Sequence, residues 1–308
     1  MADFTTTVTD AGVLDADEVT LFRDTVIYAA TPELVADQCV SVLSEGQGKM
    51  HQFAVYSNLT AMTTALTDGE DVTSSAMADS VVQITPVEQG DVITLARLAD
   101  VQSGLKAAKA AGFLIGRSAG TTLDKLAIQI LEAFSTTIIY PNSATAASNL
   151  ATSDNLDAVF ANRLYNKLAR VNIPSIGGSY IGIAHDDCLH DLRVDTANGG
   201  WIDVSKYADP QSVLRNEVGM FGGIRWLRSG NVTTTADSNG TIDSYKVEVV
   251  GFNGFGKAQA GAVELKVTGP FDKLGRYLNY GWYWLGKYSV IDTANMVQGI
   301  VASSVGAN

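Results

Sequence analysis

The spacing of apolar residues predicts helices in the first half of the chain. Residues 99–135 are rich in Ala, Leu, Lys and Gln, which are strong helix formers. Within this stretch four apolar residues fall near helical spacing and form one stripe: Leu123, Leu126, Ile130 and Leu131. We therefore expect two helices, 99–116 and 119–135, or one long helix with a kink between them near Gly116.

Two more segments carry helical signals. The stretch from Leu21 to about Leu43 is amphipathic, and Thr31-Pro32 makes a good helix start because Thr caps a helix and Pro fits its first turn. Another helix is expected over 155–171, capped by Ser153 or Asp154. Its apolar face is formed by Leu156, Val159, Phe160, Leu164 and Leu168.

The remaining apolar segments have strand-like patterns. Residues 49–57 and 81–98 are β-like, and residues 180–185 predict a short buried strand. Further candidate strands dominate the second half of the chain: 222–229, 244–252, 262–269 and 295–303. Long helices, a long hairpin and a β-rich second half together predict the α+β class.

The first two strands enclose a long polar segment, TAMTTALTDGEDVTSSAMADS. A hairpin with such a connection cannot bury itself, and a long loop without secondary structure is uncommon inside a compact domain. A binding partner on another molecule would account for it, and a mobile surface loop is the alternative. Residues 1–20, which are rich in Thr and Asp, are interpreted as an extended arm.

Composition narrows the function classes. Only 18% of the 308 residues are charged, which suits a surface that largely faces other protein. The net charge is −12, and 21 basic residues are scattered among 33 acidic ones, which argues against tight binding to nucleic acid or anionic membranes. No apolar run is long enough to span a bilayer, and the acidic N-terminus is no secretory signal. Cys39 and Cys188 are interpreted as free thiols of a cytosolic chain.

A P-loop-like run, GFNGFGKA, occupies residues 251–258. Gly251, Gly256 and Lys257 have the spacing of a nucleotide-binding loop, but Ala258 stands where Ser or Thr must hold magnesium. The following residues also continue as a strand, whereas phosphate binding needs the amides of a helix N-terminus. Nucleotide binding is therefore not expected.

The run HDDCLH at 185–190 is the other candidate for chemistry. Zinc needs four ligands, and beyond this run the chain offers only His51 and Cys39, which are distant in sequence. Nucleophilic catalysis would pair Cys188 with His190, but no third member orients the base. The two aspartates are expected to end a strand and to begin a turn or helix.

Two other groups of residues have structural interpretations that outweigh the functional ones. Arg193, Asp195, Arg215 and Glu217 resemble acid/base groups but are expected in solvated or intersubunit salt bridges. An aromatic cluster is expected to pack in the core or at a subunit interface rather than to bind sugars or bases: Tyr277, Tyr280, Trp282, Tyr283 and Trp284.

Once catalysis is set aside, four segments carry a resemblance. YIGIAHDDCLHDLRVD (180–195), RNEVGMFGGIRWLRSGNV (215–232), SYKVEVVGFNGFGKAQAGAVEL (244–265) and YGWYWLGKYSVIDTANMVQGIVASS (280–304) are similar, in this order, to segments of tailed-bacteriophage major capsid proteins. The resemblance covers roughly residues 95–304. Before that point only the layout is similar, as an arm, a long hairpin and then a long helix.

The resemblance implies the Hong Kong 97-type fold, in which an N-terminal arm and an extended loop reach over neighbouring subunits. It divides the chain into an arm, an extended loop, a peripheral domain with a long spine helix, an axial domain and return strands of the peripheral domain. The expected boundaries are, respectively, 1–46, 47–97, 98–152, 153–260 and 261–308. Some family members cross-link a Lys of the extended loop to a neighbour's Asn, and Lys49 is the only Lys in this loop.

The implied function is that of a major capsid protein without enzymatic activity, cofactor or metal. Copies would form hexamers and pentamers of an icosahedral shell around double-stranded DNA, assembled in the bacterial cytoplasm, with no membrane partner. Scaffolding, portal and decoration proteins would be its other partners. The alternatives are an encapsulin-like compartment subunit and an unrecognised cytosolic enzyme. Intersubunit contacts are expected at Lys49, Phe53, Tyr56, Asp68, Glu70, Arg97, Arg117, Arg215 and Glu217.

Overall fold

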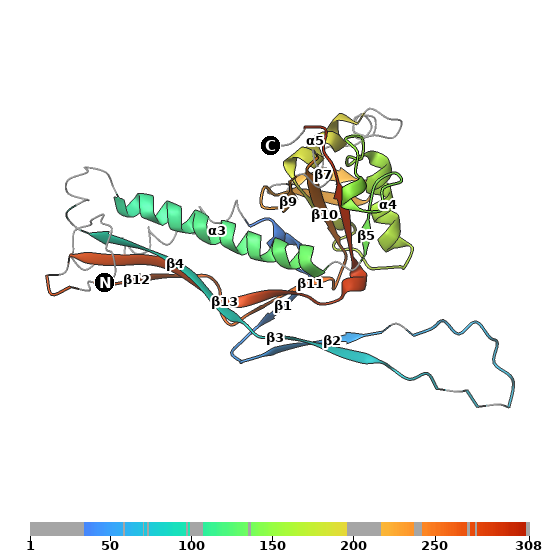
Figure 1. Ribbon diagram of the computed structural model, residues 1–308. Coiled ribbons are helices and arrows are strands. Elements are labelled where there is room, and N and C mark those ends of the chain that lie inside the picture. Colours follow the sequence, from blue (N-terminus) through green and yellow to red (C-terminus); the bar gives the residue numbers. More distant parts are fainter. Residues whose placement is uncertain are drawn as a thin grey trace.

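Where the structure describes the chain, its strands form two sheets and a separate hairpin (Figure 1). The computed structural model describes residues 34–305 apart from positions 58, 70, 73, 97, 99–106, 135–136, 196–216, 237–241, 270–271 and 275. Most of the expected arm, 1–46, lies outside the described residues. Among the described residues, the arrangement is α+β, as the sequence predicts.

The first sheet is elongated and supports one long helix, α3 (Ala107–Phe134). Its strands are β1 (Val42–Glu45), β11 (Phe255–Gln259), β13 (Tyr277–Val290), β12 (Glu264–Thr268) and β4 (Val87–Ala96). β13 pairs antiparallel with β4 along the whole length of β4. Alternate residues of β13 face α3, so Tyr280, Trp282 and Trp284 are buried in the core. This confirms the packing role predicted for these aromatics.

The helix α3 runs without interruption through Gly116, so the alternative of one long helix is correct for 107–134. Residues 99–106 lie outside the described residues. The buried stripe recurs every four positions from Ala111 to Ala127 and then widens at Ile128; its members are Ala111, Ile115, Ala119, Leu123, Ala127, Ile128 and Leu131. The high helix propensity of Ala and Leu favours the helix itself, and the buried stripe packs it against the sheet.

The second sheet has two helices on one face and α3 toward the other (Figure 1). Its strands, in order, are β5 (Ile138–Ile139), β14 (Met296–Val301), β10 (Ser244–Val250), β6 (Tyr180–Ala184), β8 (Ile224–Arg228) and β7 (Glu217–Phe221), and β9 (Thr234–Thr235) pairs with β10. The helices are α4 (Ala158–Ala169) and α5 (Asp186–Val194). Because both faces are covered, β6 is apolar and buried along its whole length, and β10 is buried at every residue except Lys246.

Trp226 lies at the centre of the core between this sheet and the two helices, with no exposed surface. Gly182 is its partner in the parallel pairing of β6 and β8. A Cβ at Gly182 would come within 2.8 Å of the Trp226 ring, so the indole fits only because position 182 has no side chain.

The junction between the two sheets is held by a buried carboxylate on α3. Asp124 Oδ1 accepts hydrogen bonds from the backbone N–H groups of Val35 and Ala36, at 2.9 and 2.7 Å. Its Oδ2 accepts from Ser229 Oγ at 2.9 Å and Asn231 Nδ2 at 2.7 Å. One side chain therefore fixes the start of the described chain, α3 and the turn after β8 to one another.

A second polar cluster lies where the C-terminal end of α3 meets the second sheet. Glu248 of β10 accepts a hydrogen bond from Gln298 Nε2 of β14, and that same nitrogen donates to the carbonyl of Glu132 at 3.2 Å. Lys246 Nζ lies 3.6 Å from the Glu132 carboxylate. Burial raises the pKa of Glu248 well above its ordinary value; the nearby Glu132 adds to this, and the Gln298 hydrogen bond and Lys246 oppose it.

Several sequence predictions need correction. The amphipathic stretch that ends near Leu43 is no helix in its described part: it forms a 3₁₀ turn (Ala36–Cys39) and then strand β1, which pairs parallel with β11. The helix expected over 155–171 is α4, and its cap is Asp157, whose Oδ1 accepts from Phe160 N at 2.6 Å. The strand expected over 81–98 is interrupted at Thr85-Pro86, where the chain leaves one sheet for another.

The last segment, 261–308, is divided between the two sheets. β12 and β13 lie in the elongated sheet with α3. β14, however, pairs with β10 and with β5 in the second sheet. The chain therefore crosses the junction once more near its end. The sequence does not predict this crossing, because an alternating pattern indicates a strand but not the sheet that the strand joins.

Candidate functional site

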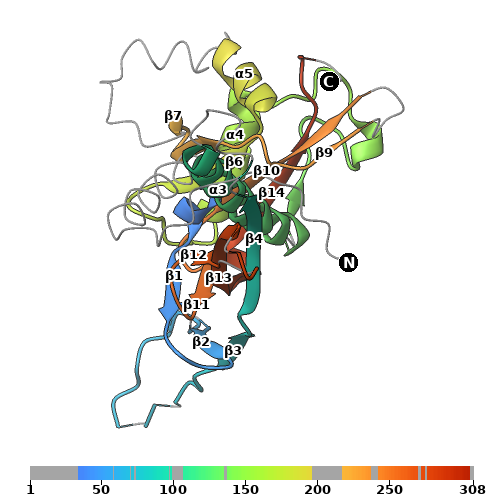
Figure 2. The same ribbon diagram turned by 90° about the vertical axis from the view of Figure 1, so that its left-hand side faces the viewer.

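A two-stranded hairpin extends away from the rest of the molecule. β2 (His51–Tyr56) and β3 (Asp79–Ile84) pair antiparallel, with His51 opposite Ile84 and Tyr56 opposite Asp79. Figures 1 and 2 show the hairpin and its connecting loop projecting beyond the elongated sheet. The strands match the prediction for 49–57 and the start of 81–98.

The connecting loop, residues 57–78, has no helix or strand at its described positions. Its ends are joined by a hydrogen bond from Ser57 N to Ala78 O at 3.0 Å. All of the loop residues whose burial the structure describes are exposed. At its described positions, this loop is therefore not packed against the described part of its own chain.

Large apolar side chains are exposed along the hairpin. We call them the hairpin surface: Tyr56, Leu59, Met62, Leu66, Val72, Met77 and Val81. Leu66 and Met77 are 70% and 71% exposed, so most of each side chain faces solvent in the isolated subunit. Apolar groups gathered in this way on a projecting element are typical of a protein–protein contact.

The base of the hairpin, by contrast, is anchored on its own subunit. Phe53 and Ile84 are buried in a small core with Ala258 and Ile291. His51 is also buried, and its Nδ1 lies 2.8 Å from Ser44 Oγ of β1. The hairpin is thus held at one end and extends freely from there.

The nine residues expected at intersubunit contacts fall into three groups. Lys49, Tyr56 and Asp68 are exposed on the hairpin or at its base, and Arg117 is exposed on α3. Phe53 is withdrawn from the set, because its side chain packs in its own subunit. Outside the described residues lie Glu70, Arg97 and Arg215; Glu217 begins β7, but its side chain is not described.

The P-loop-like run has a structural role. Gly256, Lys257 and Ala258 lie in β11 rather than in a loop before a helix. Lys257 Nζ forms an ion pair with Asp37 Oδ1 at 2.8 Å and lies 5.4 Å from the centre of the Tyr288 ring. Tyr288 donates to the same Asp37 oxygen at 2.8 Å, and burial raises the pKa of Tyr288, with Asp37 adding to the rise.

The HDDCLH run caps a helix and fills a core. His185 precedes α5, and its Nδ1 accepts from Asp187 N at 3.3 Å. Cys188 is fully buried, and burial raises the pKa of its thiol. Asp195 adds to the N-terminal capping of α4, since its Oδ2 accepts a hydrogen bond from Ala158 N at 2.9 Å. The expected turn or helix after the strand is confirmed as α5.

Within the described ranges, no group of three or more His, Cys, Asp and Glu side chains is arranged to hold a metal ion. No helix there has both the length and the apolar character to cross a bilayer.

The sequence matches no protein-family model and no curated protein. Solved structures do match. A chain from the capsid of Ralstonia phage GP4 superposes with a TM-score of 0.68 at 14% identity, covering 84% of this chain and 85% of that one. The chain has the Hong Kong 97-type fold.

Two other structures with this fold widen the comparison. The capsid of cyanophage P-SCSP1u has a TM-score of 0.63 at 13% identity, covering 86% of this chain and 87% of that one. A virus-like particle from Pyrococcus furiosus has a TM-score of 0.56 at 12% identity, covering 90% of this chain and 97% of that one. At such identities the similarity establishes the Hong Kong 97-type fold, as the sequence resemblance predicts.

Sequence reasoning missed most of the hairpin surface, because the connecting segment was interpreted as polar. Leu59, Met62 and Leu66 stand three and four positions apart within a Thr-rich stretch. Regular apolar positions in a segment that otherwise predicts no element are the signal that could have found them.

Proposed function

We propose that this chain is the major capsid protein of a tailed bacteriophage. Copies assemble as hexamers and pentamers into an icosahedral shell that encloses double-stranded DNA, and the shell is built in the cytoplasm of the bacterial host. The chain has no enzymatic role in this proposal. Scaffolding, portal and decoration proteins are the further partners that such a shell would engage.

The observation that carries this proposal is the hairpin surface. A subunit that worked alone would gain nothing from Leu59, Leu66 and Met77 held in water at the end of a projecting loop. Covered by a neighbour, the same side chains would contribute free energy to association. The hairpin is one patch and its receptor on the next subunit another, so the contact is head-to-tail, the kind of contact that forms a ring where the rotation between subunits closes.

The domain assignment follows the same division. The elongated sheet with α3 corresponds to the peripheral domain and its spine helix, and the second sheet with α4 and α5 corresponds to the axial domain. The hairpin β2–β3 with loop 57–78 is the extended loop. Repeated many times around a shell, contacts of modest strength give a stable container by multivalency.

An assembly experiment tests the proposal. The full chain is expressed, and particles are measured by sedimentation and electron microscopy, beside a variant with Leu59, Met62 and Leu66 all changed to Ser. We expect shells from the natural chain and a loss of about tenfold or more in shell yield from the variant, with an unchanged unfolding midpoint of the subunit. The matched control changes Thr60, Thr63 and Thr64 to Ser in the same loop and should assemble normally.

Two results would contradict the proposal: a natural chain that stays monomeric under all conditions, or a triple Ser variant that assembles as well as the Thr control. A second candidate function, an encapsulin-like compartment, has the similarity to the Pyrococcus furiosus particle in its favour. The contents of shells purified from the native source separate the two, since DNA that nuclease digests only after the shell is opened fits a phage head and an enclosed protein fits a compartment.

A further inference from the structure

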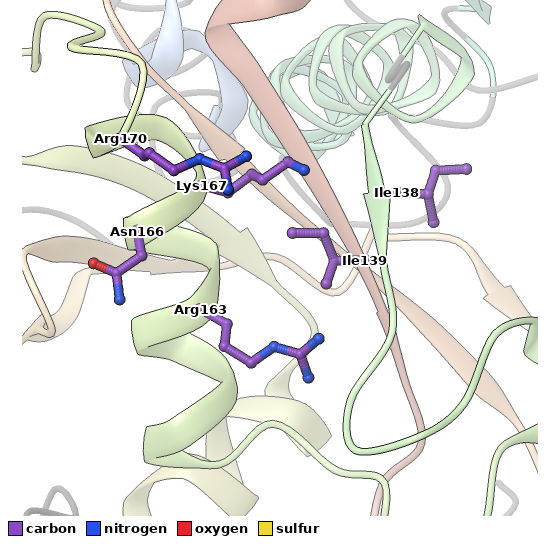
Figure 3. A pocket seen from close by; sticks show the side chains of 6 residues that line it. All are labelled: Ile138, Ile139, Arg163, Asn166, Lys167 and Arg170. Atoms are coloured by element: carbon purple, nitrogen blue, oxygen red, sulfur yellow. The ribbon is translucent and has the colours of Figure 1, made fainter.

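A groove with one basic wall lies between α4 and β5, on the second sheet (Figure 3). It has a volume of about 370 Å³. Arg163, Lys167 and Arg170 reach it from α4, and Ile138 and Ile139 line it from β5. The three cations stand at positions i, i+4 and i+7, so successive turns of one helix face place them side by side.

The charges on this wall are not neutralised within the described part of the subunit. None of Arg163, Lys167 and Arg170 forms an ion pair with a described residue, and Asn166 is the other α4 residue lining the groove. Arg163 lies over the Phe160 ring at 5.9 Å, which leaves its donors free for an anion. In a chain of net charge −12, three adjacent cations without a carboxylate partner among the described residues indicate a site for a negatively charged group.

The opposite wall is apolar and offers a strand edge. Ile138 is 46% exposed, and β5 is the edge strand of its sheet, pairing with β14 on one side. An extended peptide can add to such an edge through its backbone while its side chains meet the groove. A nucleic-acid backbone would use the cations but not the isoleucines, so the two walls together favour an acidic, partly apolar peptide.

The chain itself contains such a segment. Residues 1–33 carry seven acidic residues and one basic residue, Arg23, which leaves a net charge of −6. Within it, the run VLDADEVTLF (13–22) places three carboxylates, Asp15, Asp17 and Glu18, among apolar residues.

The position at which this segment joins the described chain also fits. The next residues, Val35 and Ala36, are tied to Asp124 together with Ser229 and Asn231, which follow β8 of the second sheet. Extended, 33 residues reach at most about 110 Å. The segment therefore starts beside the sheet that carries the groove and has more than the length needed to reach it.

We propose that the acidic N-terminal segment, through residues 13–22, docks in the groove between α4 and β5. The carboxylates of Asp15, Asp17 and Glu18 meet the cations of α4, and the apolar residues lie against Ile138 and Ile139. The inference concerns where this segment binds, and it does not depend on what a shell encloses.

Carbodiimide cross-linking tests the docking on the full chain. The reagent joins the Lys167 amine to a carboxylate in contact with it as an amide, with loss of one water, which the carbodiimide takes up in becoming a urea. After trypsin digestion we expect mass spectrometry to find Lys167 joined to Asp15, Asp17 or Glu18. In particles reassembled from light and heavy isotope-labelled chains, links of mixed mass would show that the segment comes from a neighbouring copy, and links of one mass that it comes from the same chain.

Variants make the test specific. Lys167→Arg keeps the charge but removes the amine, so this link should vanish while the fold is unchanged. Arg163→Glu with Arg170→Glu should lower the yield of the link by about tenfold, because two attractive contacts become repulsive. Lys125→Glu changes an exposed charge on α3 and should leave the yield unchanged.

Two results would overturn the docking. One is a Lys167 that stays unlinked while residues 1–33 are joined to other lysines. The other is a Lys167 that resists an amine-labelling reagent until nuclease removes DNA, which would assign the groove to nucleic acid. Because shell formation is scored by microscopy on the same samples, shells without the link refute the docking and leave the capsid function standing.

Discussion

The second sheet and the hairpin are stabilised in opposite ways. Trp226 has no exposed surface and is enclosed by two helices and a sheet, whereas Leu66 in the hairpin loop is 70% exposed. The first region buries its apolar groups within the subunit. The second region keeps apolar groups that no described part of its own chain covers. Large apolar side chains thus stabilise the subunit in one region and remain available for contact with a partner in the other, depending on which elements surround them.

The largest effect on the subunit is expected from the centre of the second sheet. Trp226→Ala would leave a cavity beside Gly182, where no side chain can fill the space. We expect a loss of about 3–5 kcal/mol in the free energy of unfolding. Guanidinium denaturation of the unassembled subunit measures it. A loss below about 1 kcal/mol would show that this core does not depend on the indole.

The next largest effect on subunit stability is expected at the junction between the two sheets, where Asp124 lies. Asp124→Ala would leave four donors, three of them buried, without their acceptor, and we expect a loss of about 2–4 kcal/mol in the free energy of unfolding. Asp124→Asn should lose less. The Ser229 hydroxyl and the Asn231 amide can turn to accept, whereas the backbone N–H groups of Val35 and Ala36 cannot.

The measurement is urea denaturation with proteolysis near residue 36 as a second readout. We expect cleavage there to rise in both variants and to rise more in Ala. Equal losses in the Ala and Asn variants would mean that the side-chain donors do not adapt, and no loss in either would remove Asp124 as the link between the two sheets.

The free energy of unfolding should also depend on pH through Glu248, which lies in the polar cluster where α3 meets the second sheet. The folded state holds a proton on Glu248 at pH values where the unfolded carboxyl, with its ordinary pKa of 4.5, has released it. Stability conferred by this group is therefore lost as pH rises above about 4.5 toward the raised folded pKa. Glu248→Gln cannot ionise, so the variant should gain on the natural chain as pH increases from 5 to 8, by less than the losses above.

Denaturation of both chains across this pH range checks the sign. Glu132 and Lys246 also face Glu248, so the comparison uses the difference between the variant and the natural chain rather than either curve alone. A constant difference would show that Glu248 is ionised in the folded protein throughout.

How much could be predicted depends on where the partners of a segment lie. The helix 119–135 and the strands 180–185 and 244–252 were predictable, because their apolar patterns report burial against nearby elements. The kink that was considered at Gly116 is absent, because α3 continues as one helix through this residue while it packs on the sheet. Strand β11 was missed because a P-loop-like spacing says nothing about pairing, and β1 pairs with it across more than 200 residues.

The exposed apolar residues of the hairpin were harder to predict for a related reason. A pattern of polar and apolar positions shows which side chains need cover, but it does not name the molecule that covers them. Lys257 illustrates the opposite case. Its partner, Asp37, lies 220 residues away, and only the folded chain shows that this lysine is an ion-pairing residue rather than a phosphate ligand.

The smallest effect on the subunit is expected in the hairpin, and it gives the clearest test of the comparison. Leu66→Ala removes a side chain that is mostly in water already, so the free energy of unfolding of the isolated subunit should change by less than about 0.5 kcal/mol. Assembly should nevertheless weaken, because each contact in a shell would lose buried apolar surface worth about 1–2 kcal/mol. The critical concentration for particle formation, measured by light scattering, should therefore rise. If Leu66→Ala lowered subunit stability and left that concentration unchanged, loop 57–78 would belong with the second sheet, as a segment folded by its own chain.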